Sequence, residues 1–350
     1  MSKEVCIVAG ALGVAGRALL AELEAGGDRE IVALSRRKPD FAARGRFIAV
    51  DLTDAAQTHD IVTGLGTVGQ VFFAAYAPRP TLGEEVAPNL DMLVNLVTAA
   101  EAASPGLRHV AIVHGSKWYG NHLGPYRTPA REDDPRHMPP NFYYDQQDWL
   151  EARQRGKAWN WSSWRPHGLC GLSVGSAMNQ LNALALYATI SRELGLPLRF
   201  PGAPGAFRAI YQFTDARLLA RAMLWAADRP ECANRAFNIT NGEFERWENL
   251  WPAIAACFDM EPGPVQNISL ARFMQDKEPL WARIRERHGL RPYALGDLVN
   301  WQFADWVYAN SFDQMSSLAR IRRAGWNEVL DAETMFRQLF DHMRAQRLIP

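Results

Sequence analysis

One lysine and two adjacent tyrosines are the residues of this 350-residue sequence best suited to catalysis. Lys117 follows an apolar run, 110–113, that predicts a buried strand, and Tyr143 and Tyr144 open a predicted helix. The carboxyl ends of parallel strands form the edge at which open α/β sheets bind ligands. A tyrosine hydroxyl with a lysine nearby can donate a proton to a developing oxyanion. Taken alone, Lys117 is equally explained as a surface residue and Tyr143 as a buried helix residue, so the interpretation depends on their surroundings.

A glycine turn near the N-terminus predicts a nucleotide site. Residues 5–8 form a short β-branched run, the segment 10–16 has glycine at every third position, and an amphipathic run to Ala25 follows. Glycines let backbone N–H groups and the helix N-terminus approach a pyrophosphate. A tight turn without a ligand is the alternative explanation. The predicted cofactor contacts here are Gly10, Leu12, Gly13, Val14 and Gly16.

The end of the second predicted strand, 31–34, indicates which dinucleotide binds. An NAD site usually carries an acidic residue there for the ribose 2′-hydroxyl. This sequence has Ser35, Arg36 and Arg37 instead, and guanidinium groups suit a 2′-phosphate. We therefore expect NADPH or NADP+ as the cofactor, with a solvated basic loop as the alternative. After the third strand, 47–50, Asp51 and Leu52 are further candidate contacts, although Asp51 could instead cap the helix that begins at 53–54.

Strands alternate with helices through the first half of the chain. This order predicts an α/β protein with a doubly wound parallel sheet, the NAD(P)-binding Rossmann fold. The Rossmann domain is expected to span 1–170 and to be completed by about 208–242. A smaller, mostly helical substrate-binding cap, interleaved with the sheet, is expected at 171–207 and 243–350. Further predicted strands are 71–74, 161–165, 198–200, 211–213 and 236–239, and further predicted helices are 89–103, 177–194, 215–227 and 247–258.

Composition excludes several classes of protein. Acidic and basic residues number 38 each, so net charge favours neither nucleic acid nor an anionic membrane as a partner. The four cysteines are scattered, which is typical of a reduced cytoplasmic protein without a zinc site. We expect no metal and no membrane-spanning helix. The oligomeric state is open, with a homodimer as one option.

By its motifs the sequence resembles the extended short-chain dehydrogenase/reductases, and within them the progesterone 5β-reductase/iridoid synthase-like (PRISE) group. The similarity extends over nearly the whole length, and the Asn-Phe-Tyr-Tyr stretch with its upstream lysine is its most specific part. Ordinary short-chain enzymes place a lysine four residues after the catalytic tyrosine, but here Gln147 and Asp148 follow Tyr143 and Tyr144 at that spacing. The motifs that carry the resemblance are Ser35–Arg37, Gly115–Gly120, Pro139–Tyr144, Trp161–Pro166, Ser176–Asn179, Phe237–Gly242 and Lys277–Trp281.

The resemblance implies a mechanism and a substrate class. Its members bind NADPH and reduce the carbon–carbon double bond of activated enones, with the lysine from the strand end, here Lys117, and the first tyrosine of the pair, here Tyr143. A small hydrophobic α,β-unsaturated carbonyl compound is the implied substrate, with Tyr143, Tyr76 and Met178 as its expected contacts. Plant members usually have Trp where Tyr76 stands and Thr where His114 stands, and both differences should reshape the substrate floor. The remaining expected cofactor contacts are Ala75, Tyr76, Lys117, Tyr143, Pro166 and Leu169.

Two other functions stay open at this stage. A carbonyl reductase or alcohol dehydrogenase would send the hydride to the carbonyl carbon, with Tyr143 as full proton donor. A regulator that senses NADP without turning it over is a different class, although such proteins typically lack the tyrosine. A sugar-nucleotide epimerase is less expected, because the cap has no basic cluster for a diphosphate.

Overall fold

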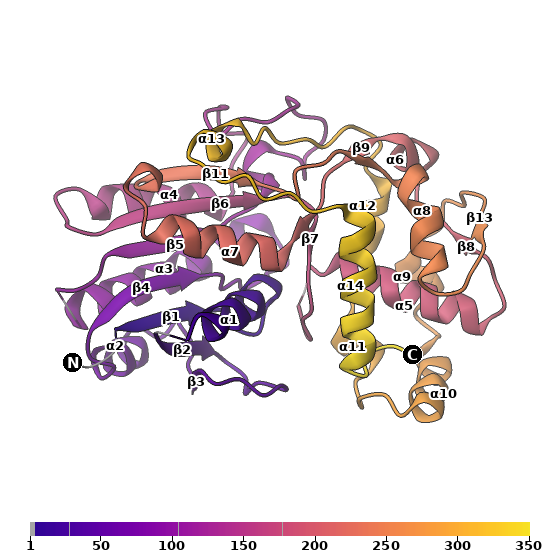
Figure 1. Cartoon of the computed structure of the whole chain (residues 1–350), viewed down its shortest axis with the longest axis horizontal. Coiled ribbons are helices and arrows are strands. Elements are labelled where there is room, and N and C mark those ends of the chain that lie inside the picture. Colours follow the sequence, from indigo (N-terminus) through magenta and orange to yellow (C-terminus); the bar gives the residue numbers. More distant parts are fainter. Residues whose placement is uncertain (1–3, 28, 104, 177) are drawn as a thin grey trace. The chain divides into compact units, whose positions relative to one another are not determined.

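In the computed structural model, which describes residues 4–27, 29–103, 105–176 and 178–350, the apolar runs of the N-terminal half pair into one parallel sheet. Its seven strands are ordered β11-β6-β5-β4-β1-β2-β3, which Figure 1 shows from top to bottom. The order reverses between β1 and β4, the switch point at which doubly wound sheets bind ligands. The Rossmann fold predicted from the alternation of strands and helices is confirmed. The strands are β1 (Val5–Ala9), β2 (Glu30–Ser35), β3 (Arg46–Ala49), β4 (Val68–Phe73), β5 (His109–Val113), β6 (Asn160–Pro166) and β11 (Arg235–Ile239).

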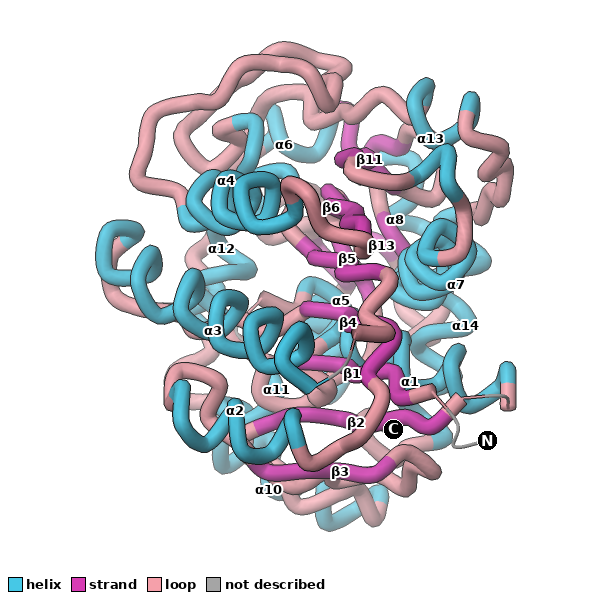
Figure 2. Tube along the Cα trace, turned by 90° about the vertical axis from the view of Figure 1, so that its left-hand side faces the viewer, coloured by secondary structure: helices cyan, strands magenta, loops and turns pink. Residues whose placement is uncertain are grey.

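Helices cover both faces of this sheet. Figure 2 shows α2, α3 and α4 along one face and α1 and α7 along the other, and the neighbours α2–α3, α3–α4 and α1–α7 are in contact. The central strands β1 and β4 are buried along their whole length, as strands covered on both faces must be. The helices are α1 (Val14–Gly26), α2 (Ala55–Thr63), α3 (Leu82–Ala103), α4 (Phe142–Gln154), α7 (Ala216–Ala227) and α13 (Ala319–Arg323), with the 3₁₀ turns η1 (Ser116–Tyr119) and η2 (Pro230–Cys232).

One helix boundary differs substantially from the prediction. The sequence pattern predicts a helix that begins at Asn89, directly after Pro88, whereas α3 begins at Leu82 and contains Pro88. Proline removes one backbone donor and is usually found in the first turn of a helix. Here the helix continues through it, and the side chain of Asn89 donates to the Glu85 carbonyl oxygen at 2.7 Å. As a result Glu84 and Glu85 lie in the first turn of a helix rather than in a loop.

The chain divides into two compact units. The sheet unit comprises 1–166, 216–239 and 317–327, and the helical unit comprises 167–215, 240–316 and 328–350. The sequence analysis placed 167–170, 208–215 and 240–242 with the sheet and 317–327 with the cap, and the structure assigns each of these segments to the other unit. The short segment 317–327 belongs to the sheet unit because α13 packs against β11.

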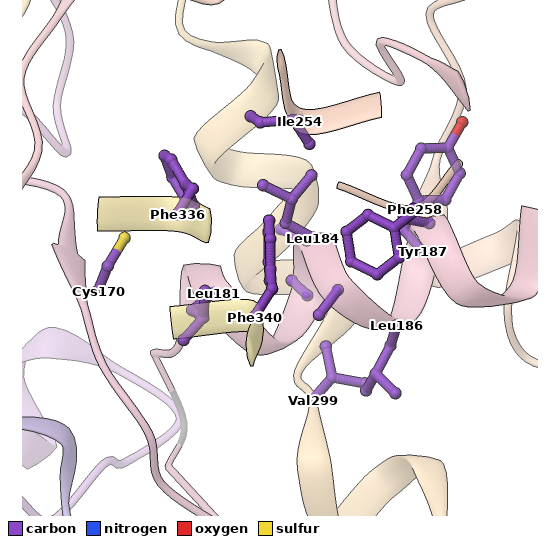
Figure 3. Close-up of a cluster of buried hydrophobic side chains, with 14 of the residues drawn as sticks. Cys170, Leu181, Leu184, Leu186, Tyr187, Ile254, Phe258, Val299, Phe336 and Phe340 are labelled. Carbon is purple, nitrogen blue, oxygen red and sulfur yellow. The ribbon is translucent and has the colours of Figure 1, made fainter. Parts of the chain in front are cut away.

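The helical unit is built around an apolar core. Figure 3 shows side chains of α5, α8 and α14 in this cluster, among them Leu184, Ile254 and Phe340. Trp281 is fully buried in it, as core packing of the tryptophans predicts. The helices are α5 (Gln180–Glu193), α6 (Pro204–Arg208), α8 (Trp247–Ala256), α9 (Leu270–Phe273), α10 (Glu278–His288), α11 (Leu295–Leu298), α12 (Trp301–Ala309) and α14 (Ala332–Ala345). The strands, which pair two by two, are β7 (Leu169–Cys170), β8 (Leu198–Arg199), β9 (Ile210–Tyr211), β10 (Thr214–Asp215), β12 (Glu245–Arg246) and β13 (Pro262–Gly263).

Candidate active site

The glycine turn between β1 and α1 has the geometry that a dinucleotide requires. Gly10 has φ +74°, and a Cβ there would lie 2.4 Å from the Ala74 carbonyl oxygen. A Cβ on Gly16 would lie 2.2 Å from the Gly10 carbonyl oxygen. Gly13 is the N-cap of α1 and brings no capping side chain, and the first turn has no acidic residue. The helix N-terminus is thus uncapped by any side chain, an arrangement that fits an anionic pyrophosphate.

The predicted 2′-phosphate contacts follow β2, the strand that pairs with β1. Arg36 and Arg37 are exposed, and the Arg37 backbone N–H donates to Ser35 Oγ at 3.3 Å. Asp51, at the end of β3, accepts from the backbone N–H and hydroxyl of Thr53, which together with Arg36 lower the pKa of its carboxyl. The cap of α2 is Asp54, so Asp51 is not the helix cap. A contact of Asp51 with adenine stays a prediction.

Asn141 links the two segments that carry the predicted catalytic residues. Its side-chain oxygen accepts from the Tyr143 backbone N–H at 3.2 Å, which caps α4. Its side-chain nitrogen donates to the Lys117 carbonyl oxygen at 2.9 Å. A single buried side chain therefore fixes the helix of Tyr143 against the turn of Lys117. Asparagine before a predicted helix is a strong N-cap signal, yet the sequence reasoning assigned this residue no role.

The two tyrosine hydroxyls have different environments. Tyr144 Oη donates to the Trp118 carbonyl oxygen at 2.7 Å and accepts from the His137 backbone N–H at 2.9 Å. Tyr143 Oη has no hydrogen-bond partner among the described residues. Gly115 lies beside it, where a Cβ would be 3.4 Å from Oη. Tyr144 is thus committed to the fold, whereas the hydroxyl of Tyr143 is available to a ligand.

Burial controls the protonation of Tyr143 and Lys117. Burial, and secondly the charge of Glu85, raise the pKa of Tyr143 above its ordinary value. Burial lowers the pKa of Lys117, and Glu85 opposes that effect. Lys117 is partly buried, so the alternative of an ordinary surface lysine does not hold.

A buried arginine network occupies the helix position where ordinary enzymes of this fold have lysine. Gln147 Oε1 accepts from Arg165 Nη2 at 3.1 Å. Arg165 is 1 % exposed, and its guanidinium lies 3.7 Å from the centre of the Trp118 ring. Burial lowers the pKa of this arginine. The α4 position one turn after Tyr143 therefore holds Gln147, hydrogen-bonded to Arg165, and has no lysine ammonium group.

His114 supports the ring of Tyr143. Their ring centres are 4.8 Å apart, and His114 Nδ1 is 2.8 Å from Ser163 Oγ. Burial holds the pKa of His114 well below its ordinary value, so the imidazole is neutral at neutral pH. The His114 ring also stacks on Trp118 with centres 5.8 Å apart, and the effect of His114 on the substrate floor stays a prediction.

Tyr76, in the loop after β4, is hydrogen-bonded to a carboxylate of α3 that the sequence did not predict. Tyr76 donates its hydroxyl hydrogen to Glu85 Oε1, and its ring stacks on Phe142 with centres 5.7 Å apart. Asn89 fixes the loop by two hydrogen bonds to the backbone of Ala77. The sequence analysis missed Glu85 because its predicted helix began only at Asn89, after the residue.

The other residues predicted to contact the cofactor or the substrate are divided between the sheet unit and the helical unit. Ala75 is partly buried next to Tyr76, Leu52 is buried, and Pro166 ends β6. Leu169 and Met178 belong to the helical unit, and their approach to the cofactor or substrate stays a prediction. Within the described residues no group of three or more His, Cys, Asp or Glu side chains could hold a metal ion. No helix in the described part of the chain combines the length and apolarity needed to cross a bilayer.

Comparison with known proteins agrees with this geometry. Residues 50–350 match the model of the PRISE-like Rossmann-fold domain. An (S)-8-oxocitronellyl enol synthase of Camptotheca acuminata is 31% identical, over 99% of this chain and 94% of that protein. A short chain dehydrogenase of Penicillium aethiopicum is 30% identical, over 99% of both chains. Among solved structures, UDP-glucose 4-epimerase from Thermotoga maritima aligns with a TM-score of 0.70 at 14% identity, over 97% of this chain and 99% of that one.

The epimerase likeness concerns the fold alone, but the family match and the full-length relatives extend to the segment that holds Lys117 and Tyr143. The chain therefore belongs to the PRISE family of the extended short-chain dehydrogenase/reductases, and is an oxidoreductase of that superfamily.

Proposed function

We propose that this protein is an NADPH-dependent reductase of the carbon–carbon double bond of α,β-unsaturated carbonyl compounds. The observation that carries the proposal is the contrast between the two tyrosines: Tyr144 Oη has two internal hydrogen bonds, whereas Tyr143 Oη has none among the described residues. The similarity to proteins named as enol synthases supports the same reaction class.

Tyr143 stabilises charge on the carbonyl oxygen. When bound, the cofactor supplies a hydride, which the proposed reaction delivers to the β-carbon. Negative charge then develops on the carbonyl oxygen as an enolate, and a donor aimed at that oxygen is worth roughly 3–4 kcal/mol. Because burial raises its pKa, Tyr143 keeps its proton and acts as a hydrogen-bond donor. Solvent then protonates the α-carbon.

The absence of a lysine on the tyrosine helix favours this reaction over carbonyl reduction. A carbonyl reductase needs the tyrosine to release its proton, which an ammonium group one turn along assists by lowering its pKa. Here Gln147 and Arg165 are bonded to each other at that place. Stabilisation of an enolate requires only a hydrogen bond, so the charge of Lys117 from the strand end suffices.

The residues at the nucleotide end support NADPH as the form bound. The glycine turn and the open N-terminus of α1 would hold the pyrophosphate. Arg36 and Arg37 would contact the 2′-phosphate in place of the acid that an NAD site uses.

The test follows NADPH consumption with trans-2-hexenal and 2-cyclohexenone, and identifies the products. Saturated aldehyde and ketone with deuterium from labelled NADPH at the β-carbon are expected. Allylic alcohols with the label at the carbonyl carbon would instead establish a carbonyl reductase. If a broad panel gave no turnover while NADPH binding changed the affinity for another macromolecule, the protein would be an NADP sensor.

A further inference from the structure

Tyr143 lacks the hydrogen bonds that fix its neighbour. The hydroxyl of Tyr144 is bonded to the backbone at both Trp118 and His137, and these bonds fix the orientation of the Tyr144 ring. Tyr143 Oη has no hydrogen-bond partner among the described residues, yet the proposed reaction needs this oxygen to point at a substrate carbonyl. A buried phenol without a hydrogen bond is held by the packing of its ring. The groups that pack on the Tyr143 ring therefore determine where its hydroxyl points.

Two rings pack on the ring of Tyr143. The Phe142 ring lies edge-on with its centre 4.6 Å away, but Phe142 is the preceding residue of α4 and moves with the same helix. The His114 imidazole lies with its centre 4.8 Å away, at an interplanar angle of 32°. His114 follows β5, and its backbone N–H donates to the Trp164 carbonyl oxygen of β6 at 2.8 Å. The imidazole is therefore the ring that fixes Tyr143 relative to the sheet.

His114 is itself fixed by its neighbours. Its Nδ1 is 2.8 Å from Ser163 Oγ of β6, and its ring stacks on Trp118 with centres 5.8 Å apart and an interplanar angle of 24°. The Arg165 guanidinium in turn covers the Trp118 ring, 3.7 Å from its centre. His114 is 5 % exposed, and Trp118 and Arg165 are buried as well. A close-packed and hydrogen-bonded ring has little freedom to reorient, so the imidazole presents a fixed face to the tyrosine.

We propose that His114 is a positioning residue of the active site, whose flat and fixed ring holds the Tyr143 ring in the orientation that presents Oη to the substrate carbonyl. The proposal rests on the proposed function, because it concerns the same tyrosine. It assigns the role to the shape of the ring and not to the acid–base chemistry of an imidazole. Burial, and secondly the charge of Arg165, hold the pKa of His114 well below its ordinary value. The imidazole is therefore neutral at neutral pH, and an uncharged aromatic ring of similar size can replace it.

Two substitutions separate the ring from its hydrogen bond. His114→Phe keeps a flat, neutral ring but cannot bond Ser163. His114→Asn keeps a polar atom near the position of Nδ1 but has no ring. With trans-2-hexenal, His114→Phe should retain kcat, whereas His114→Asn should lower it by roughly tenfold or more, because misplacement of a reacting group by about 1 Å can cost ~10²-fold. NADPH affinity and the KM for the enal should change little in either variant.

His109→Asn is the matched control. His109 is the fully buried histidine at the other end of β5, and its Nε2 is 2.9 Å from the hydroxyl of Ser162 in β6. Its replacement should lower the free energy of unfolding without a change in kcat. A merely structural role of His114 would give this same result in His114→Asn. A fall of kcat at saturating NADPH and enal in His114→Asn, with rescue by His114→Phe, is the result that positioning predicts.

A second measurement needs no turnover. The sequence has nine tyrosines, and in protein with ¹³C in the tyrosine rings the NMR signal lost in Tyr143→Phe belongs to Tyr143. A buried ring flips only when its neighbours move aside, so the flip rate measures how firmly the ring is held. In the full-length protein the flip rate of Tyr143 should rise by roughly tenfold or more in His114→Asn, since the space left by a packed ring permits the motion. It should stay close to its original value in His114→Phe and in His109→Asn.

The outcomes separate this proposal from the proposed reaction. An unchanged flip rate of Tyr143 in His114→Asn would overturn the proposal, even if the enzyme proves to be an ene-reductase. Equal losses of kcat in His114→Phe and His114→Asn would overturn it as well. If His114→Asn does not fold, His114→Leu, which fills a similar space without a flat ring, is held to the same criteria. A faster flip in a protein that turns over no enal would keep the assignment of His114 and reject the proposed reaction.

Discussion

The tyrosine pair offers a test in which two changes of one atom have opposite consequences. Tyr143→Phe and Tyr144→Phe each remove a single buried hydroxyl from adjacent residues of α4. Tyr143 Oη has no internal partner in the described structure, so its loss should leave the free energy of unfolding nearly unchanged. Turnover should fall by two decades or more, the value of a donor aimed at a developing oxyanion. NADPH affinity should be nearly intact.

Tyr144→Phe should show the reverse pattern. Its hydroxyl has two hydrogen bonds, to the Trp118 carbonyl oxygen and from the His137 backbone N–H. The loss of the hydroxyl leaves the buried Trp118 carbonyl oxygen without this donor, so the free energy of unfolding should fall by about 1–3 kcal/mol. Turnover of the folded enzyme should change much less than in Tyr143→Phe.

The assays are urea unfolding followed by circular dichroism, NADPH binding by fluorescence, and kcat with trans-2-hexenal. The reasoning is refuted if Tyr143→Phe retains its turnover. It is also refuted if Tyr144→Phe, folded and saturated with NADPH, loses as much turnover as Tyr143→Phe.

Three further predictions concern the cofactor, the helix cap and acid stability. Replacement of Arg36 and Arg37 by Ala should weaken NADPH binding far more than NADH binding, by about 1.5–3 kcal/mol for each lost contact; equal dissociation constants for NADPH and NADH in the unmodified protein would contradict it. Asn141→Ala should destabilise the protein by about 1 kcal/mol through loss of the cap and also lower kcat, whereas Asn141→Asp should retain the cap; urea unfolding and kcat measure both effects. Burial lowers the pKa of His109 to about 4 and of His167 to about 3 from 6.5, so each stabilises the fold above pH 6.5. That contribution is lost as the pH falls towards 4, at up to about 1.4 kcal/mol per pH unit for each histidine, and unfolding free energies measured between pH 7 and pH 5 should decline accordingly.

The strand pattern could be predicted from sequence because it depends on local features. The β-branched run before the glycines and the apolar run before His114 are each followed by a turn or a polar segment, and both form strands of the predicted sheet. The glycine turn could be predicted from its spacing between a strand and a helix; a Cβ at Gly16 would meet the turn itself, whereas the short contact at Gly10 is with distant Ala74 and could not be foreseen.

The parts that sequence did not predict depend on distant partners. Helix α3 continues through Pro88, and a tertiary contact lies at that point: the side chain of Gln146, in α4, donates to the Asn89 carbonyl oxygen at 2.7 Å. Such contacts override the rule that places proline at a helix start. Because the predicted helix began at Asn89, Glu85 lay outside it, and the burial of Glu85 beside Tyr76 was not predicted. The association of 317–327 with the sheet likewise joins segments about 80 residues apart, for which no local pattern exists.

The position of the lysine decides what the tyrosine can do. When tyrosine and lysine share a helix face, the ammonium group lies close to the phenol and lowers its pKa, which suits full proton transfer. In this chain Lys117 lies in the turn after β5, and the side chains of Asn141 and Tyr144 connect that turn to the helix of Tyr143. Burial and, secondly, the charge of Glu85 then raise the pKa of the Tyr143 phenol, and both favour its protonated form. A phenol that retains its proton but has no internal acceptor is suited to bind an enolate oxygen and poorly suited to protonate an alkoxide. The placement of the lysine in the turn after β5, and not on the tyrosine helix, therefore supports the proposal that the double bond is reduced and not the carbonyl group.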